Sequence, residues 1–198
     1  MSAIGLSADV GVVALGLITA NILLGLLISV RYSPWRSWPH RRINIFWFHN
    51  QTGWLALGVA VLHPVLLLFS QRAGFDLLDV VFPAWAPKQP TVFLLGALGV
   101  YCLCFVLLTS HYRAQLGRRR WKTLHFSTYV LAGLVFIHSL LTNPDLNGRP
   151  VNLLDGGKMF AEGCLLVLAA AIFLRVRYAL RKARRVPLPG ESVAEGTL

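Results

Sequence analysis

Residues 48–68 read FHNQTGWLALGVAVLHPVLLL, and residues 121–141 read WKTLHFSTYVLAGLVFIHSLL. Each stretch is strongly apolar and carries two histidines, His49 with His63 and His125 with His138. A titratable imidazole in hydrocarbon costs free energy unless it has a partner or a function. Two such pairs, at separations of 14 and 13 residues, therefore indicate one repeated feature rather than chance.

The composition places both stretches in a membrane. The chain is 56% hydrophobic and 14% charged, and its mean hydropathy is positive. A helix needs roughly 20 apolar residues to cross a hydrocarbon core, and five runs meet this need, at about 8–30, 47–70, 91–110, 122–142 and 159–178. These runs are too long for barrel strands, and only helices or closed barrels satisfy their backbone at that depth. We expect an all-α membrane protein, a bundle of about five transmembrane helices.

The basic residues indicate the orientation of this bundle. Segments on one side hold 15 of the 19 basic residues. They are Arg31, Arg36, Arg41 and Arg42 after the first run, Arg113, Arg118, Arg119, Arg120 and Lys122 after the third, and Arg175, Arg177, Arg181, Lys182, Arg184 and Arg185 after the fifth. The positive-inside rule puts the N-terminus outside and the C-terminus in the cytoplasm. Topology and anionic lipid explain the formal charge of +11, so we expect no nucleic-acid partner.

The runs and loops predict one membrane domain over 1–178 and a tail over 179–198 that is basic and then flexible. The first run is expected to be retained rather than cleaved, because no Lys or Arg precedes it and it is too long for a signal peptide. Cys102, Cys104 and Cys164 lie within runs and are expected to pack, not to form disulfides. The loops are too short for a nucleotide-binding domain, so a partner or a diffusible carrier must supply the reductant or oxidant.

The two histidine runs cross the membrane in the same direction, so their histidines form two levels. His49 and His125 are expected near the cytoplasmic face, and His63 and His138 near the external face. At about 1.5 Å per residue the two levels are roughly 20 Å apart. Each level can clamp one haem iron between two helices, and ligation by two imidazoles suits electron transfer because no coordination position stays open.

The angular spacing fits this interpretation unevenly. On an ideal helix 14 residues return to within about 40° of the starting face, whereas 13 residues miss it by about 140°. The fourth run would need a tightened or wide turn, or the two haems a sideways offset. The competing interpretation is that the histidines are polar residues that hydrogen-bond between helices.

The two quoted stretches, with LLTSHYRAQLGRRRW at 107–121, resemble the ferric reductase-like transmembrane domain superfamily. This superfamily includes the membrane parts of NADPH oxidases and ferric reductases and the haem subunit of bacterial methionine sulfoxide reductase systems, which carry the same spacing of 14 then 13. The resemblance covers about residues 10–178. It implies two haem b groups, with His49 and His125 as axial ligands of the cytoplasmic-side haem iron and His63 and His138 of the external-side one.

The sequence departs from the full oxidases of this superfamily, which usually have six spans and a C-terminal flavin and nicotinamide module. Five spans and no such module are found here, so donor and acceptor stay open. Five basic residues are candidate contacts to the propionates of the cytoplasmic-side haem, although topology and lipid binding are their more ordinary roles. They are Arg113, Arg118, Arg119, Arg120 and Lys122.

Four further polar or helix-breaking residues have ordinary explanations. Pro64 removes a helical hydrogen bond and either bends the second run around a macrocycle or makes a simple packing kink. His40 and His111 lie beside arginines and are expected to be solvated or interfacial. Asn21 is expected to form an interhelical hydrogen bond rather than to act in redox chemistry.

The sequence thus favours an integral membrane cytochrome b of a bacterial cytoplasmic (inner) membrane. It would move single electrons between a cytoplasmic-side flavoprotein or quinol and an external or membrane acceptor. Expected partners are membrane lipid, a redox protein or quinone, with a flavin or quinone at the cytoplasmic face. Two alternatives are a reductase of ferric iron or oxygen at the external face and a non-catalytic anchor subunit of a larger membrane complex.

Overall fold

The computed structural model describes residues 2–30, 44–71, 73–143, 146 and 152–184. In these ranges all regular structure is helical, and five helical segments are long and apolar enough to cross a membrane. The segments are Ala3–Ser29, Ile45–Phe69, Pro90–His111, Arg113–Leu141 and Gly156–Lys182. The predicted all-α fold with five spans is therefore confirmed.

The helices are α1 (Ala3–Ser29), α2 (Ile45–Val65), α3 (Leu77–Val81), α4 (Pro90–His111), α5 (Arg113–His125), α6 (Ser127–Leu141) and α7 (Gly156–Arg184), with 3-10 turns η2 (Leu66–Phe69) and η3 (Pro83–Trp85). Side-chain caps begin α1 and α2, the first two of these helices. The Ser2 hydroxyl accepts the Gly5 N–H of α1 at 3.1 Å, and the Asn44 side chain accepts the N–H groups of Phe46 and Trp47 in α2. Such caps satisfy donors that a helix start leaves open.

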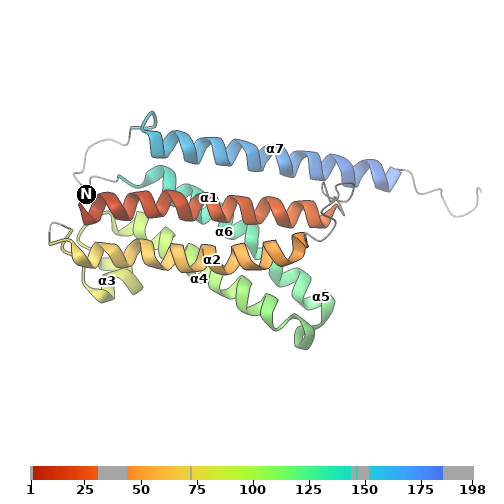
Figure 1. Ribbon diagram of the computed structural model, residues 1–198, viewed down its shortest axis with the longest axis horizontal. Helices are drawn as coiled ribbons and strands as arrows, with labels where there is room; N and C mark the ends of the chain where they lie inside the picture. Colours follow the sequence, from red (N-terminus) through yellow and green to blue (C-terminus); the bar gives the residue numbers. More distant parts are fainter. Residues whose placement is uncertain (1, 31–43, 72, 144–145, 147–151, 185–198) are drawn as a thin grey trace, which may run out of the picture.

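The long helices run side by side along the long axis of the molecule (Figure 1). Helix α1 packs against α2, α6 and α7, while α4 packs against α6 and α2. Helix α3 lies at the same end as the N-terminus, and α5 lies at the opposite end (Figure 1).

The middle of the bundle is a layer of buried apolar side chains from four helices. Its members are Ala14, Ile18, Ala56, Ala60, Leu103, Leu107 and Leu131. The outward surface is apolar as well, since Leu55, Val130 and Leu166 are 55%, 60% and 71% exposed. Exposing so large an apolar surface to water would cost free energy, whereas contact of the same surface with lipid tails does not.

The helix bounds differ from the predicted runs in three places. The first span begins at Ala3 rather than near residue 8, because the capped start includes a mixed polar and apolar turn. The fourth is divided into α5 and α6 at Phe126. The fifth continues to Arg184, past the predicted end near 178, so the first part of the predicted tail is helical. The remaining tail, 185–198, and the basic segment 31–43 lie outside the described residues.

Candidate functional site

The structure brings the four histidines together as two pairs. The ring centroids of His49 and His125 are 6.2 Å apart, with their planes at 75°. The ring centroids of His63 and His138 are 6.3 Å apart, with their planes at 70°. Each pair joins α2 to the α5–α6 segment, one near the start of α2 and the other near its end.

A tightened turn reconciles the 13-residue spacing with this pairing. The Phe126 N–H donates to the Thr123 carbonyl at 3.2 Å, and the Tyr129 N–H donates to the Phe126 carbonyl at 3.1 Å. Both bonds close three-residue turns of the 3-10 type, which rotate the chain more per residue than an α-helix does. His125 is the last residue of α5 and His138 belongs to α6, so the two rings need not follow one ideal helix.

Backbone carbonyls fix the ring orientation of three histidines. His49 Nδ1 lies 3.0 Å from the Asn21 carbonyl oxygen, and His63 Nδ1 lies 2.7 Å from that of Ser7. His138 Nδ1 lies 2.8 Å from the carbonyl oxygen of Val92. Because a carbonyl only accepts, Nδ1 carries the hydrogen in each neutral ring and Nε2 keeps a free lone pair. No Nε2 atom of these rings forms a hydrogen bond to the described residues.

His125 has a different neighbour. Its Nδ1 lies 3.3 Å from the Ser110 hydroxyl oxygen, which also accepts the indole N–H of Trp121 at 3.3 Å. The Trp121 ring lies against His125 with 5.3 Å between centroids. This ring is therefore held by a hydroxyl and an indole instead of a helix carbonyl.

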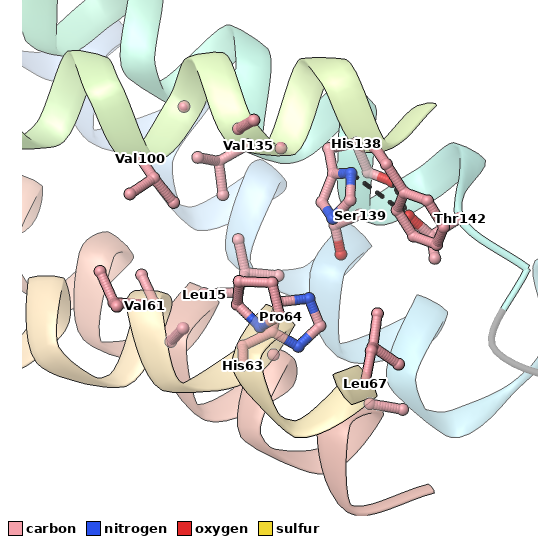
Figure 2. Close-up of a pocket in the computed structure, with 18 of the residues that line it drawn as sticks. Leu15, Val61, His63, Pro64, Leu67, Val100, Val135, His138, Ser139 and Thr142 are labelled. Atoms are coloured by element: carbon pink, nitrogen blue, oxygen red, sulfur yellow. Dashed lines mark hydrogen bonds between the residues drawn. The ribbon is translucent and has the colours of Figure 1, made fainter. Parts of the chain in front are cut away.

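The His63–His138 pair borders a cavity of about 350 Å³, a size typical of cofactor and ligand sites. Figure 2 shows both rings facing this space from opposite helices, among apolar side chains such as Leu15 and Val100. An apolar site with a few converging polar groups is what a flat, largely hydrophobic cofactor requires.

Lys158 of α7 lines the same cavity and is only 5% exposed. Its ammonium donates to the Thr142 carbonyl at 2.5 Å and to the Ser139 carbonyl. These carbonyls belong to the C-terminal end of α6, where helical partners run out and a positive charge is stabilised. The sequence did not single out Lys158 as a site residue. A single lysine at the start of a long apolar run is the signal that could have identified it.

The basic residues predicted to contact propionates lie on α5, at the end of the molecule that holds the His49–His125 pair. The Arg113 guanidinium lies over the Phe46 ring, 4.7 Å from its centroid. The other four side chains are exposed, and none of the five is hydrogen-bonded to His49 or His125. They are Arg118, Arg119, Arg120 and Lys122.

Asn21 forms the predicted interhelical hydrogen bonds, with its amide donating to the His49 carbonyl at 2.5 Å and to Thr52 Oγ1 at 2.8 Å. His111 ends α4, is exposed and belongs to neither pair. His40 lies outside the described residues. Pro64 lies one residue before the end of α2, where the helix tightens into η2. The three cysteines are free thiols, as predicted.

Comparisons with known proteins identify the family to which the sequence is similar. A family model described as ferric reductase like transmembrane component matches residues 10–136, a range that includes three of the four histidines and ends two residues before His138. The chain is 32% identical over 106 residues to magnetosome protein MamZ of Magnetospirillum gryphiswaldense. It is 31% identical over 106 residues to MamZ of Paramagnetospirillum magneticum. Each match covers 52% of this chain but 16% of the relative. No solved structure matches.

Proposed function

Since the chain belongs to the ferric reductase like transmembrane component family, we propose that it is a di-haem cytochrome b that carries single electrons across a membrane. His49 and His125 are the axial ligands of the cytoplasmic-side haem iron, and His63 and His138 those of the external-side haem iron. The donor is a cytoplasmic-side flavoprotein or quinol, and the acceptor lies outside or in the membrane.

The separation of the paired rings carries this proposal. An imidazole nitrogen binds a transition-metal ion at about 2.0–2.1 Å, so the centroids of two rings on opposite sides of one ion lie roughly 6 Å apart. The separations of 6.2 and 6.3 Å match that value at both levels. Hydrogen bonding between helices alone does not require the same separation of ring centroids at both levels.

The donor set fits a haem rather than a bare metal ion. Across the described part of the chain, no group of three or more His, Cys, Asp or Glu side chains could hold a metal ion. A porphyrin supplies four nitrogen ligands itself and needs two from the protein. Each level offers two imidazoles, and three of the four rings present Nε2 as the free nitrogen.

The protein's own residues perform two tasks in this function, and the haem supplies the redox chemistry. The two imidazoles of each level would hold the haem iron from both sides and so would exclude oxygen and water from direct binding to it. The apolar layer from Ala56, Leu103 and Leu131 separates the two levels and keeps water out of the interval. The haem supplies one-electron chemistry, since its iron alternates between ferric and ferrous states with unchanged ligands.

The same proposal assigns partners and location. Exposed basic side chains of α5 offer an attractive rim for an acidic redox protein, for anionic lipid or for haem propionates. A flavin or quinone at that face would pass electrons to the first haem. The relatives are bacterial proteins in which the matched region is 16% of the length. This supports placing the domain in a bacterial inner membrane as part of a larger complex.

The test is a difference spectrum of the purified protein together with its haem content. We expect b-type bands and about two haems per chain. With excess haem, His63→Ala and His138→Ala should each remove the external haem, and His49→Ala and His125→Ala the cytoplasmic one. His111→Ala, which alters a histidine outside both pairs, should keep both haems. A colourless wild type would refute the proposal and favour the anchor function, and a shared phenotype of His49→Ala and His138→Ala would refute the pairing.

A further inference from the structure

Three glycines on the helices opposite the histidines lie directly against their rings. A Cβ added to Gly96 would lie 2.8 Å from His138 Cε1, and one added to Gly11 would lie 3.0 Å from His63 Nδ1 and Cε1. A Cβ added to Gly25 would lie 3.2 Å from His49 Cε1. Contacts of 3.0 Å or less force either the ring or the helix to move.

Each glycine also lies four residues after the carbonyl that holds its histidine. The pairs are Ser7 with Gly11, Asn21 with Gly25, and Val92 with Gly96. In an α-helix the side chain of a residue covers the turn on its N-terminal side. Any larger residue at the fourth position would therefore cover the carbonyl that the ring must reach. Glycine leaves that carbonyl open to a second donor besides its helical N–H.

On α1 this arrangement occurs twice, 14 residues apart, opposite two histidines of α2 that are also 14 apart. The contact is reciprocal at both places. The Ser7 hydroxyl donates to the His63 carbonyl at 2.8 Å, just as the Asn21 amide donates to the His49 carbonyl. Each of these two-way contacts between α1 and α2 is called a clasp below. Because the Ser7 clasp and the Asn21 clasp have the same geometry in one register, the glycines are not merely small residues at a helix crossing.

We propose that Gly11, Gly25 and Gly96 are positioning residues for the axial ligands, which rests on the proposed function. By exposing a helix carbonyl to Nδ1–H, each glycine fixes the tautomer and the ring plane. A carbonyl that accepts from Nδ1 raises the basicity of the ligating Nε2. On α1 the two glycines are 14 residues apart, and on α4 the residue 14 positions after Gly96 is Ser110. Its hydroxyl lies beside His125 Nδ1, where the other three histidines have a helix carbonyl.

Single alanine variants of the three glycines test this proposal. Gly96→Ala and Gly11→Ala should alter the external haem alone, and Gly25→Ala the cytoplasmic haem alone. The expected change is loss of that haem in Gly96→Ala, where the contact is tightest, and a shifted midpoint potential and ferric EPR signal in the other two. Matched controls are Gly58→Ala, Gly133→Ala and Gly163→Ala, since an added Cβ there meets nothing within 4 Å. Alanine favours helix over glycine at all six positions, so a general folding defect is not expected.

A measurement on the haem-free protein separates the effect of the Gly96–His138 contact from the effect of haem binding. In the haem-free protein Gly96→Ala should lower the unfolding temperature, but in a His138→Ala background it should not, because the ring that meets the methyl is gone. Two haems in the wild type with glycine variants that behave like the controls would overturn this inference and leave the proposed function standing. Absence of haem from the wild type would overturn the proposed function, while the haem-free unfolding comparison would still decide the ring contact.

Discussion

At the scale of single residues, the environments of the four imidazoles are unequal. Three rings donate to a helix carbonyl, which is a strong acceptor fixed in place. His125 faces the Ser110 hydroxyl, which also accepts a hydrogen bond from the Trp121 indole N–H. A hydroxyl can rotate and can donate as well as accept. The His49–His125 pair therefore contains the one imidazole of the four whose hydrogen bond is adjustable.

Replacing Ser110 by alanine should change only the cytoplasmic haem. The His125 Nδ1 hydrogen loses its acceptor, its Nε2 becomes less basic, and ferric iron is stabilised less. We expect the midpoint potential of that haem to rise by on the order of tens of millivolts, as measured by redox titration. Thr109→Ala is the matched control, because Thr109 bonds only to carbonyls of its own helix. Equal shifts of both haems would contradict the assignment.

The sequence predicted which histidines pair with each other, but it did not predict which residues orient their rings. An imidazole in an apolar run is a local signal, and its spacing needs no knowledge of neighbouring helices. Gly11 and Gly25 matter because of which helix packs on which, and in what register. Their one signal was a polar residue followed four positions later by glycine, repeated after 14 residues as the histidines of α2 are. That correspondence becomes informative only when α1 and α2 are known to be neighbours.

At the scale of elements, two helix ends shape the site. The C-terminal end of α6 presents carbonyls to the buried Lys158, and these carbonyls lie one and four residues after His138 along the chain. The junction of α5 and α6 supplies the extra rotation that the fourth span needs. Periodicity predicted the need for such a turn, yet its position at Phe126 depends on packing that a single helical pattern does not contain.

Replacing Lys158 by methionine should lower the midpoint potential of the external haem. A positive charge near the iron disfavours the ferric state, and its field is weakly screened where water is scarce. Its removal should shift that potential down by on the order of tens of millivolts, while Lys158→Arg keeps the charge and the potential. Redox titration of both variants measures this. An unchanged potential in a folded Lys158→Met protein would show that the lysine acts only as a helix cap.

Inserting one alanine between Phe126 and Ser127 should uncouple the two levels. One added helical residue rotates His138 by about 100° relative to His125, so only one of the two pairs can stay aligned. We expect about one haem per chain to be lost, as determined from haem content and the difference spectrum. An alanine inserted after Gly117 is the control, because it leaves the spacing of His125 and His138 unchanged and this exposed glycine has nothing near its Cβ position. Retention of both haems would contradict this expected loss and show that a regular helix with the 14-residue spacing of α2 can replace the tightened turn.

At the scale of the whole molecule, the fold places two sites at opposite ends of a dry bundle. Hydropathy predicted the five spans well, because helices in lipid must satisfy their own backbone and must be about as long as the membrane is thick. It predicted the split of the fourth span and the length of α7 less well. Both depend on side-chain contacts near the membrane surface, where polar and apolar residues are mixed.

Vesicles provide the test at this scale. With the basic α5 end outward, the protein should accept electrons from an impermeant reductant outside and reduce an acceptor trapped inside. Gly25→Ala and Ser110→Ala, which alter the entry level, should slow this transfer, whereas Gly58→Ala should not. The rate of reduction of the trapped acceptor is the measurement. Intact vesicles that contain both haems but move no electrons would contradict transmembrane transfer and favour a reductase or anchor function at one face.

The shared helix α1 has a consequence for how the cofactors are acquired. Its Ser7 and Asn21 clasps are rigidly joined, so aligning α1 with α2 at one end aligns it at the other. On the proposed function, the first haem to bind would bear most of the entropy cost of ordering the helices, and the second would find its histidines already in register. We therefore expect haem uptake to be cooperative. When haem is limiting, chains with none or two should outnumber chains with one in native mass spectra.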